Sequence, residues 1–397
     1  MEPNARSTEV WVVVNENHRQ VPVATVPVAD RWARIFRDVE LDERFDVRPV
    51  TLRELPRLAS AHKGPVWLAD GSFAIETLAV ETIWEQSEPC RSNELQLSTG
   101  PMGLAPLACA GAEVLPRVAE LLDPESYDSL VDALSRLEQA EVHVTSRAHE
   151  ELFWRQVLDD QGARAAEWGM LKRLRMRPGG VVAQFLNRPV SIAATRLVAN
   201  TRITPNQTTI AAFVIGLIGV GFVFVGRHWA AVLGTFLLHV NSILDGCDGE
   251  LAILKHQRSD FGGFLDSICD EILNALILVA IGYYLRETRS WDWYLYLGGF
   301  AGFMSMFYAL VHWHCKWRHG LGFYWWWDAY KPRKKVQREM SLRYYLKNLF
   351  VKDSTLLLYF VLAVVDFLQP VVFIGAAVGA VAVVLFVIHI GILRARW

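Results

Sequence analysis

Apolar and polar positions follow different patterns in the two halves of the 397-residue chain. In the first half, short apolar runs alternate with segments whose apolar positions recur three and four residues apart. The runs EVWVVV, FDVRPV and GPVWLADGSFAI predict strands, and PESYDSLVDALSRLEQA predicts a helix. This alternation predicts a soluble α/β domain over residues 1–150.

A helical connector is expected over residues 151–203. Its segment NRPVSIAATRLVANTRI has the pattern of an amphipathic helix lying on a membrane surface, and an ordinary linker helix would show the same pattern. The next residues, TPNQTT, predict a helix start with Thr204 as the N-cap and Pro205 at the first helical position.

Long apolar runs dominate residues 204–397. A helix needs about 20 residues to cross a hydrocarbon layer of about 30 Å, and backbone groups in lipid must be paired within the helix. Residues 204–397 are therefore expected to form an α-helical integral membrane domain of six transmembrane helices. The expected spans are residues 207–226, 229–247, 262–285, 293–313, 354–369 and 371–393.

Loop charge predicts the orientation of this multi-pass domain. Residues 314–353 contain ten Lys and Arg residues, and such residues collect on the cytosolic side. Both termini and the α/β domain are then expected on the cytosolic side of an inner or cell membrane.

The net charge of −2 gives no reason to expect a nucleic-acid partner. The five cysteines lack the spacing of a metal or disulfide framework and are read as reduced thiols.

Carboxylates are concentrated where the second and third apolar runs approach each other. Asp245 and Asp248 are three residues apart, and Asp266 and Asp270 are four apart, so each pair shares one helix face. Four nearby negative charges need compensation, and carboxylate oxygens suit a hard divalent cation such as Mg²⁺ or Mn²⁺. The pattern predicts a metal site on the cytosolic side.

The stretch DGCDGELAILKHQRSDFGGFLDSICD, residues 245–270, resembles the signature of the CDP-alcohol phosphotransferase (phosphatidyltransferase) family, D-x-x-D-G-x-x-A-R-x8-G-x3-D-x3-D. Every spacing is kept, and one position differs because Ile253 replaces the arginine. The preceding LNRPVSIAATRLVANTRITPNQTT is similar to the segment leading into the membrane in two-domain, inositol-phosphate-type members. The resemblance implies that residues 1–185 are a degenerate, catalytically inactive cytidylyltransferase-like (nucleotidyltransferase-like) domain, with Asp70 as a remnant of its metal site.

The resemblance also implies a reaction and its residues. A phosphoalcohol group would move from a CDP-alcohol to a hydroxyl acceptor, a lipid or a polyol, with release of CMP, in phospholipid or polar-head-group synthesis. Two metal ions would be held by Asp245, Asp248, Asp266 and Asp270, with Asp270 also the general base. The nucleotide is expected at Gly249, Ala252, Gly262, Asn206, Thr209, Lys255 and Arg258. The acceptor is expected at Arg343, Lys347 and Lys352. Helix capping would explain Asn206 and Thr209 equally well, and loop charge would explain the three acceptor residues.

Three other interpretations remain open. The acceptor could be a soluble phosphorylated polyol such as inositol phosphate. Ile253 and the degenerate first domain fit a non-catalytic membrane scaffold, against which the four aspartates count. A cation transporter would place its carboxylates near the midplane rather than near one face. Members of the resembled family are commonly homodimers, and a homodimer is expected here.

Overall fold

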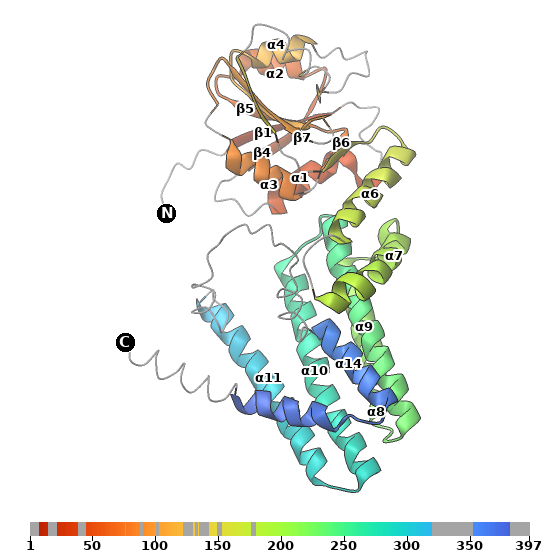
Figure 1. The fold of residues 1–397 in the computed structure, drawn as a ribbon. Helices are drawn as coiled ribbons and strands as arrows, with labels where there is room; N and C mark the ends of the chain where they lie inside the picture. The colour runs from red at the N-terminus through yellow and green to blue at the C-terminus, as the bar shows by residue number, and fades with distance from the viewer. Residues whose placement is uncertain are drawn as a thin grey trace, which may run out of the picture. The chain divides into compact units, whose positions relative to one another are not determined.

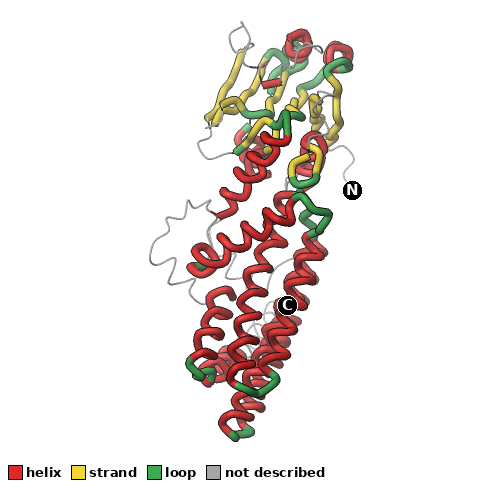
Figure 2. Tube along the Cα trace, turned by 90° about the vertical axis from the view of Figure 1, so that its right-hand side faces the viewer, coloured by secondary structure: helices red, strands yellow, loops and turns green. Residues whose placement is uncertain are grey.

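The computed structural model divides into two compact units. It describes residues 8–14, 22–38, 45–75, 77–87, 90–100, 103–121, 130–131, 134, 143–148, 153–175, 180–319 and 352–381. The α/β unit comprises Met1–Leu174, Arg196–Arg202 and Leu251–Arg258, and the helical unit comprises Arg175–Thr195, Ile203–Glu250 and Ser259–Trp397. Strands gather in the α/β unit (Figure 2).

A mixed sheet forms the centre of the α/β unit, with strand order β10-β7-β9-β5-β1-β4. The pairs β1–β4, β1–β5 and β10–β7 are parallel, while β9 runs antiparallel to both β5 and β7. Its strands are β1 (Thr8–Val14), β4 (Phe45–Thr51), β5 (Val66–Asp70), β7 (Glu94–Gly100), β8 (Gly103–Leu104), β9 (Leu107–Ala110) and β10 (His143–Ala148). Two short pairs lie outside it, β2 (Pro22–Val23) with β3 (Val26–Pro27), and β6 (Phe73–Ile75) with β11 (Trp154–Gln156).

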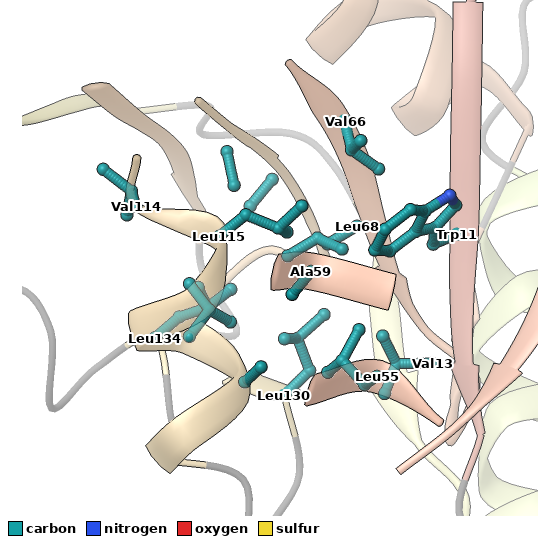
Figure 3. Close-up of a cluster of buried hydrophobic side chains, with 14 of the residues drawn as sticks. Trp11, Val13, Leu55, Ala59, Val66, Leu68, Val114, Leu115, Leu130 and Leu134 are labelled. Carbon is teal, nitrogen blue, oxygen red and sulfur yellow. The ribbon is translucent and has the colours of Figure 1, made fainter. Parts of the chain in front are cut away.

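Helices cover both faces of this sheet because its strands are apolar on both sides. Trp11 and Val13 of β1 pack into one buried cluster, and the intervening Val10, Val12 and Val14 pack into another. The first cluster lies under α2 (Leu55–Ala61) and α4 (Leu115–Leu121) (Figure 3). The second lies under α1 (Val28–Asp38) and α3 (Thr77–Gln86). The α/β class and the three strand runs are confirmed; most of the helix expected at residues 124–140 lies outside the described residues.

Two helical segments precede the apolar helices. The first is α6 (Asp160–Arg175), and the second consists of a π-helix, η1 (Ala183–Asn187), continued directly by α7 (Arg188–Ala199). Phe185, Leu186, Val190 and Leu197 are 44–81% exposed on this second segment. Its opposite side is buried and polar, with Ser191 and Thr195 at 1% and 0% exposure. Apolar groups on the exposed side are the pattern of a helix at a membrane surface.

Among the described residues of the helical unit that follow α7, most lie in long helices (Figure 1). They are α8 (Pro205–Val223), α9 (His228–Leu254), α10 (Asp260–Arg289), α11 (Trp293–His319) and α14 (Lys352–Val364), followed by an apolar helix at Gln369–Val381. Thr204 is the N-cap of α8 as expected, and with Gln207 it forms a capping box. Close glycine contacts allow α8 and α9 to approach, because a Cβ on Gly234 would lie 2.5 Å from the Gly219 carbonyl oxygen.

Helices occur at all six expected spans, but fewer of them have the character of a membrane span. Within the described residues, three helices are long and apolar enough to cross a membrane: Pro205–Val223, His228–Leu254 and Trp293–Val311. The helix α10 is longer, and its charged residues lower its hydropathy. The helices α14 and Gln369–Val381 have 13 described residues each. Three of the six expected spans thus have the length and apolar composition that a membrane crossing needs, and the other three stay a prediction.

Candidate functional site

The four aspartates of the signature lie on the consecutive helices α9 and α10. Helix α10 starts cleanly because the Ser259 hydroxyl accepts a hydrogen bond from the Gly262 N–H at 3.0 Å. Asn206 of α8 also lies close to this start. A Cβ on Gly262 would lie 3.0 Å from Asn206 Oδ1, so the glycine permits the close approach of α8 and α10.

Three of the aspartates converge. Single carboxylate oxygens of Asp245, Asp266 and Asp270 all lie within 4.8 Å of one another. Asp266 Oδ1 is buried and has no hydrogen-bond partner among the described residues. A buried carboxylate oxygen without a donor is costly, and a cation would satisfy it. The donor set, three carboxylates and no sulfur or imidazole, fits Mg²⁺ or Mn²⁺.

Asp248 faces a different partner. Its Oδ2 accepts a hydrogen bond from the Thr209 hydroxyl on α8, and its Oδ1 accepts one from the Gly249 N–H at 2.5 Å. A Cβ built on Gly249 would meet no atom within 4 Å, so space is open beside Asp248. Thr209 orients this carboxylate, and Gly249 leaves room next to it.

Lys352 at the start of α14 brings a positive charge to the cluster. Its Nζ donates to Asp245 Oδ2 at 2.9 Å and also to Asp270 Oδ1. All three side chains are 22–23% exposed. One ammonium therefore balances part of the charge of two carboxylates, Asp245 and Asp270. The structure places Lys352 at the carboxylates, while Arg343 and Lys347 lie outside the described residues.

Two buried polar networks beside this cluster were missed from the sequence. Glu250 accepts hydrogen bonds from the Ser191 and Thr195 hydroxyls at 2.6 and 2.7 Å. Ser242 accepts from Asn187 Nδ2 at 3.2 Å and donates to Asp353 at 2.5 Å. The i, i+4 spacing of Ser191 and Thr195 is a signal that could have indicated a buried partner. Polar groups inside a bundle of apolar helices are costly and commonly functional.

The turn after α9 carries the remaining expected nucleotide residues. Ala252 and Ile253 are half-buried on the last turn of α9, and Arg258 is exposed. Lys255 is 1% exposed, and its Nζ donates to the Thr201 carbonyl at 2.7 Å. Burial lowers the pKa of Lys255. Of the two loop cations, Arg258 is thus the one open to solvent.

Asp70, at the end of β5, is sealed inside the α/β unit. It is 3% exposed, and its Oδ1 accepts from the backbone N–H and hydroxyl of Ser72 at 2.9 and 2.7 Å. Its Oδ2 accepts from the Val131 N–H at 3.3 Å. Burial raises the pKa of Asp70, against the effect of these bonds. Both oxygens serve the fold, which fits a structural role.

Comparison with known proteins supports the similarity of the helical part. The model of the CDP-alcohol phosphatidyltransferase family matches residues 202–388. A bifunctional IPC transferase and DIPP synthase of Aquifex aeolicus (strain VF5) is 32% identical over 141 residues, 35% of this chain and 31% of that protein. The protein of the same name from Thermococcus kodakarensis is 26% identical over 277 residues, 69% of this chain and 59% of that protein. An archaetidylinositol phosphate synthase of Pyrococcus horikoshii is 37% identical over 97 residues, 24% of this chain and 49% of that protein. This chain thus spans less than two thirds of each of these relatives.

Proposed function

We propose that this chain, whose residues 202–388 match the model of the CDP-alcohol phosphatidyltransferase family, transfers a substituted phosphate group from a CDP-alcohol to a hydroxyl acceptor. The acceptor oxygen forms a bond to the phosphorus that carries the alcohol, the bond from that phosphorus to the CMP oxygen breaks, and CMP leaves. The observation that carries the proposal is the convergence of three carboxylates from α9 and α10 within 4.8 Å at the signature spacing.

The carboxylates would hold the metal. The proposed ligands of two Mg²⁺ or Mn²⁺ ions are the four signature aspartates, Asp245, Asp248, Asp266 and Asp270. When bound, such ions neutralise the charge of a diphosphate and of the leaving CMP. The unpartnered Asp266 Oδ1 supports a cation at this position. Thr209 would keep Asp248 turned toward the open space at Gly249.

Asp270 is the proposed general base, which takes the proton of the acceptor hydroxyl. A base must be ionised before it acts, and the bond from Lys352 favours the ionised carboxylate. Lys352 would then keep Asp270 in its ionised form before the acceptor binds. It would also orient that carboxylate toward the position of the acceptor.

The nucleotide is proposed to lie beside Gly249, Ala252 and Gly262, with Asn206 and Thr209 at its edge. Ile253 removes the signature's arginine, and Lys255 is engaged with a backbone carbonyl. Arg258 is exposed and remains the proposed replacement for that arginine. This assignment makes nucleotide affinity depend on a flexible side chain rather than on one fixed within α9.

A lipid-linked substrate is favoured over two soluble ones. A cavity of about 1070 Å³ opens among α10, α11, α14 and the helix Gln369–Val381. Its lining is mostly apolar and includes Leu278, Met304 and Val378. It also includes Ser354, whose buried Oγ has no hydrogen-bond partner among the described residues and which follows Lys352 by two positions. An apolar tail could fill this cavity while its head group lies at the carboxylates.

Location and assembly follow from the same proposal. The six helical segments would cross the membrane with the carboxylates on the cytosolic side, where the basic residues of 314–353 are expected. The α/β unit would be catalytically inactive, since Asp70 is buried and hydrogen-bonded. A homodimer in the membrane is proposed on the family resemblance alone.

The direct test is CMP release by the purified full chain. CDP-diacylglycerol and soluble CDP-alcohols are each supplied with Mn²⁺ or Mg²⁺ and with lipid or polyol acceptors. We expect metal-dependent CMP release with a lipid-linked substrate, and its loss in Asp270→Asn and Asp266→Asn. Release that depends only on soluble substrates would favour a polyol reaction. Absence of CMP release across the panel, with the protein folded, would favour a non-catalytic relative.

A further inference from the structure

The last turn of α9 has an unusual ending. Helix α9 runs unbroken from His228 to Leu254, and its residues from Leu251 onward belong to the α/β unit. The N–H of His256 bonds the Ile253 carbonyl at 3.3 Å, and the N–H of Gln257 bonds the Ala252 carbonyl at 2.9 Å. This is the Schellman pattern. His256 holds the left-handed position with φ 48°, which a residue other than glycine adopts only at a cost.

Two carbonyls beyond this pattern are bound by arginines. Arg31 Nη1 donates to the Leu254 carbonyl at 2.9 Å, and Arg34 Nη1 donates to the Lys255 carbonyl at 3.2 Å. Both arginines lie on α1, more than 200 residues earlier in the chain. The α/β unit therefore binds the terminal carbonyls that a helix cannot pair by itself.

Arg31 is fully buried, and its guanidinium makes several contacts at this position. It is 0% exposed, and its Nη1 also donates to the Val23 carbonyl at 3.0 Å while Nη2 contacts Met170 Sδ at 3.4 Å. The rigid guanidinium fork presents several donors in one plane, which a lysine does not. A cation at a helix C-terminus also interacts favourably with the helix dipole.

A second set of bonds holds the same turn from α7. Lys255 Nζ donates to the Thr201 carbonyl just after α7, and Asn200 Nδ2 donates to Glu167 Oε2 at 3.1 Å. Glu167 Oε1 in turn accepts from the Ala24 N–H at 2.7 Å, next to the strand that carries Val23. The turn after α9, the end of α7 and the start of the α/β unit thus form one hydrogen-bonded assembly.

We propose that Arg31, assisted by Arg34, is a positioning residue for the carboxylate site. Leu254 follows Asp248 by six residues on one continuous helix, and residues 255–259 connect it directly to α10. Fixing this turn fixes the register of α9 against α10, and with it the spacing of Asp245 from Asp266 and Asp270. The α/β unit, whose Asp70 is sealed, then has a function as the cap of the signature helix. The capping of α9 by Arg31 and Arg34 is argued from their hydrogen bonds alone. The effect of this cap on metal binding rests on the proposed function.

Hydrogen exchange of the full chain in detergent tests the cap. In Arg31→Met we expect the amides of Lys255, His256 and Gln257 to exchange about 10-fold faster, because a charge-assisted hydrogen bond at their turn is lost. The amides of β5 should change less than about two-fold. Arg57→Met is the control, an exposed arginine on α2 of the same unit. Unchanged protection at residues 255–257 would overturn the cap, as would equal acceleration in β5, which would mean that Arg31 only stabilises the unit.

Mn²⁺ binding, followed by the EPR signal of the free ion, tests the positioning role. We expect Arg31→Met to raise the Mn²⁺ Kd about five-fold, a modest loss because the ligands remain present. Arg31→Lys should fall between Met and wild type, and Arg57→Met should leave the Kd unchanged. An unchanged Kd in Arg31→Met with a released turn would overturn positioning. A wild-type protein that binds no Mn²⁺ would instead contradict the proposed metal site, and with it the positioning of that site. The exchange data would still decide the cap.

Discussion

Lys352 Nζ lies 2.9 Å from Asp245 Oδ2, across 107 positions of the sequence, and it also contacts Asp270. The start of α14 is thereby tied to α9 and α10 through charge. This ammonium reduces the repulsion among the carboxylates of the cluster.

Replacing Lys352 by Met should destabilise the metal-free protein and increase the stabilisation that added Mn²⁺ gives to its fold. Removing one partner of a buried ion pair costs about 3–5 kcal/mol, and the partial exposure of these groups places the loss near the lower end. About 3 kcal/mol corresponds to a fall in melting temperature of roughly 6–12 °C. Thermal unfolding in detergent with and without Mn²⁺ measures this. The control is Lys172→Met, an exposed lysine on α6. An equal loss with saturating Mn²⁺ would show that Lys352 and the metal do not share these carboxylates.

Replacing a glycine of the site by alanine can change nucleotide binding without disturbing helix packing, and Gly249 is the position that tests this. Gly249→Ala should leave the melting temperature unchanged or raise it, since an added Cβ meets no atom within 4 Å and helix entropy gains about 0.5–1 kcal/mol. The same change should weaken CDP binding several-fold if the nucleotide occupies that space. Unaltered CDP affinity would remove Gly249 from the proposed nucleotide site.

Gly234→Ala should behave in the opposite way. Its Cβ would lie 2.5 Å from the Gly219 carbonyl oxygen, so α8 and α9 must separate. Overpacking of this kind costs about 1–3 kcal/mol. Gly221→Ala is the matched control on α8, where a Cβ meets nothing within 4 Å. Melting temperatures of the two variants should therefore move in different directions, and a common direction would contradict the packing described.

Ile253→Arg tests the one departure from the signature. A charge-assisted hydrogen bond to a phosphate is worth about 1.5–3 kcal/mol, so CDP should bind about 10-fold tighter or more. Ile253→Met, which adds length without charge, should leave the affinity near that of wild type. Isothermal titration with CDP and Mn²⁺ measures both. An Arg variant that binds no more tightly would show that the nucleotide phosphates do not reach this turn.

Asp70→Asn tests whether the α/β unit contributes to chemistry. Asparagine keeps one of the acceptor oxygens and removes a carboxylate whose pKa is raised by burial. A raised carboxyl pKa means that the folded state binds the proton more tightly, so ionised Asp70 costs stability as pH rises above its usual value near 4. The variant should therefore lose this pH-dependent term and keep full CMP release. A large fall in CMP release with the fold intact would contradict an inactive α/β unit.

Local signals predicted much of this architecture. The Thr204 cap, the strands β1, β4, β5 and β6 and the two aspartate-bearing helices all follow from spacing within a few residues. Asp245, Asp266 and Asp270 could be placed together because helix periodicity fixes the face on which each lies. The spans were harder, since the charged residues that build the site also lower the hydropathy of α10.

Contacts between distant residues could not be predicted in this way. The bond from Arg31 to Leu254 joins residues 223 positions apart, and nothing in the local sequence of α1 indicates it. The partners of Glu250 on α7 and the position of Lys352 among the aspartates likewise depend on tertiary packing. Lys255 looked available for a phosphate from its position in the loop, and only the structure shows its bond to Thr201.

The most direct measurement is the melting temperature of the full chain with CDP, in the presence and absence of Mn²⁺. A ligand at about 100 times its Kd stabilises the folded state by about 2.7 kcal/mol, a rise of roughly 5–10 °C. We predict this rise for wild type only when metal and nucleotide are both present. It should be absent in Asp248→Asn and retained in Asp260→Asn, whose aspartate is exposed at the start of α10. No rise in wild type, or an equal rise in Asp248→Asn, would contradict a metal-dependent nucleotide site at these carboxylates.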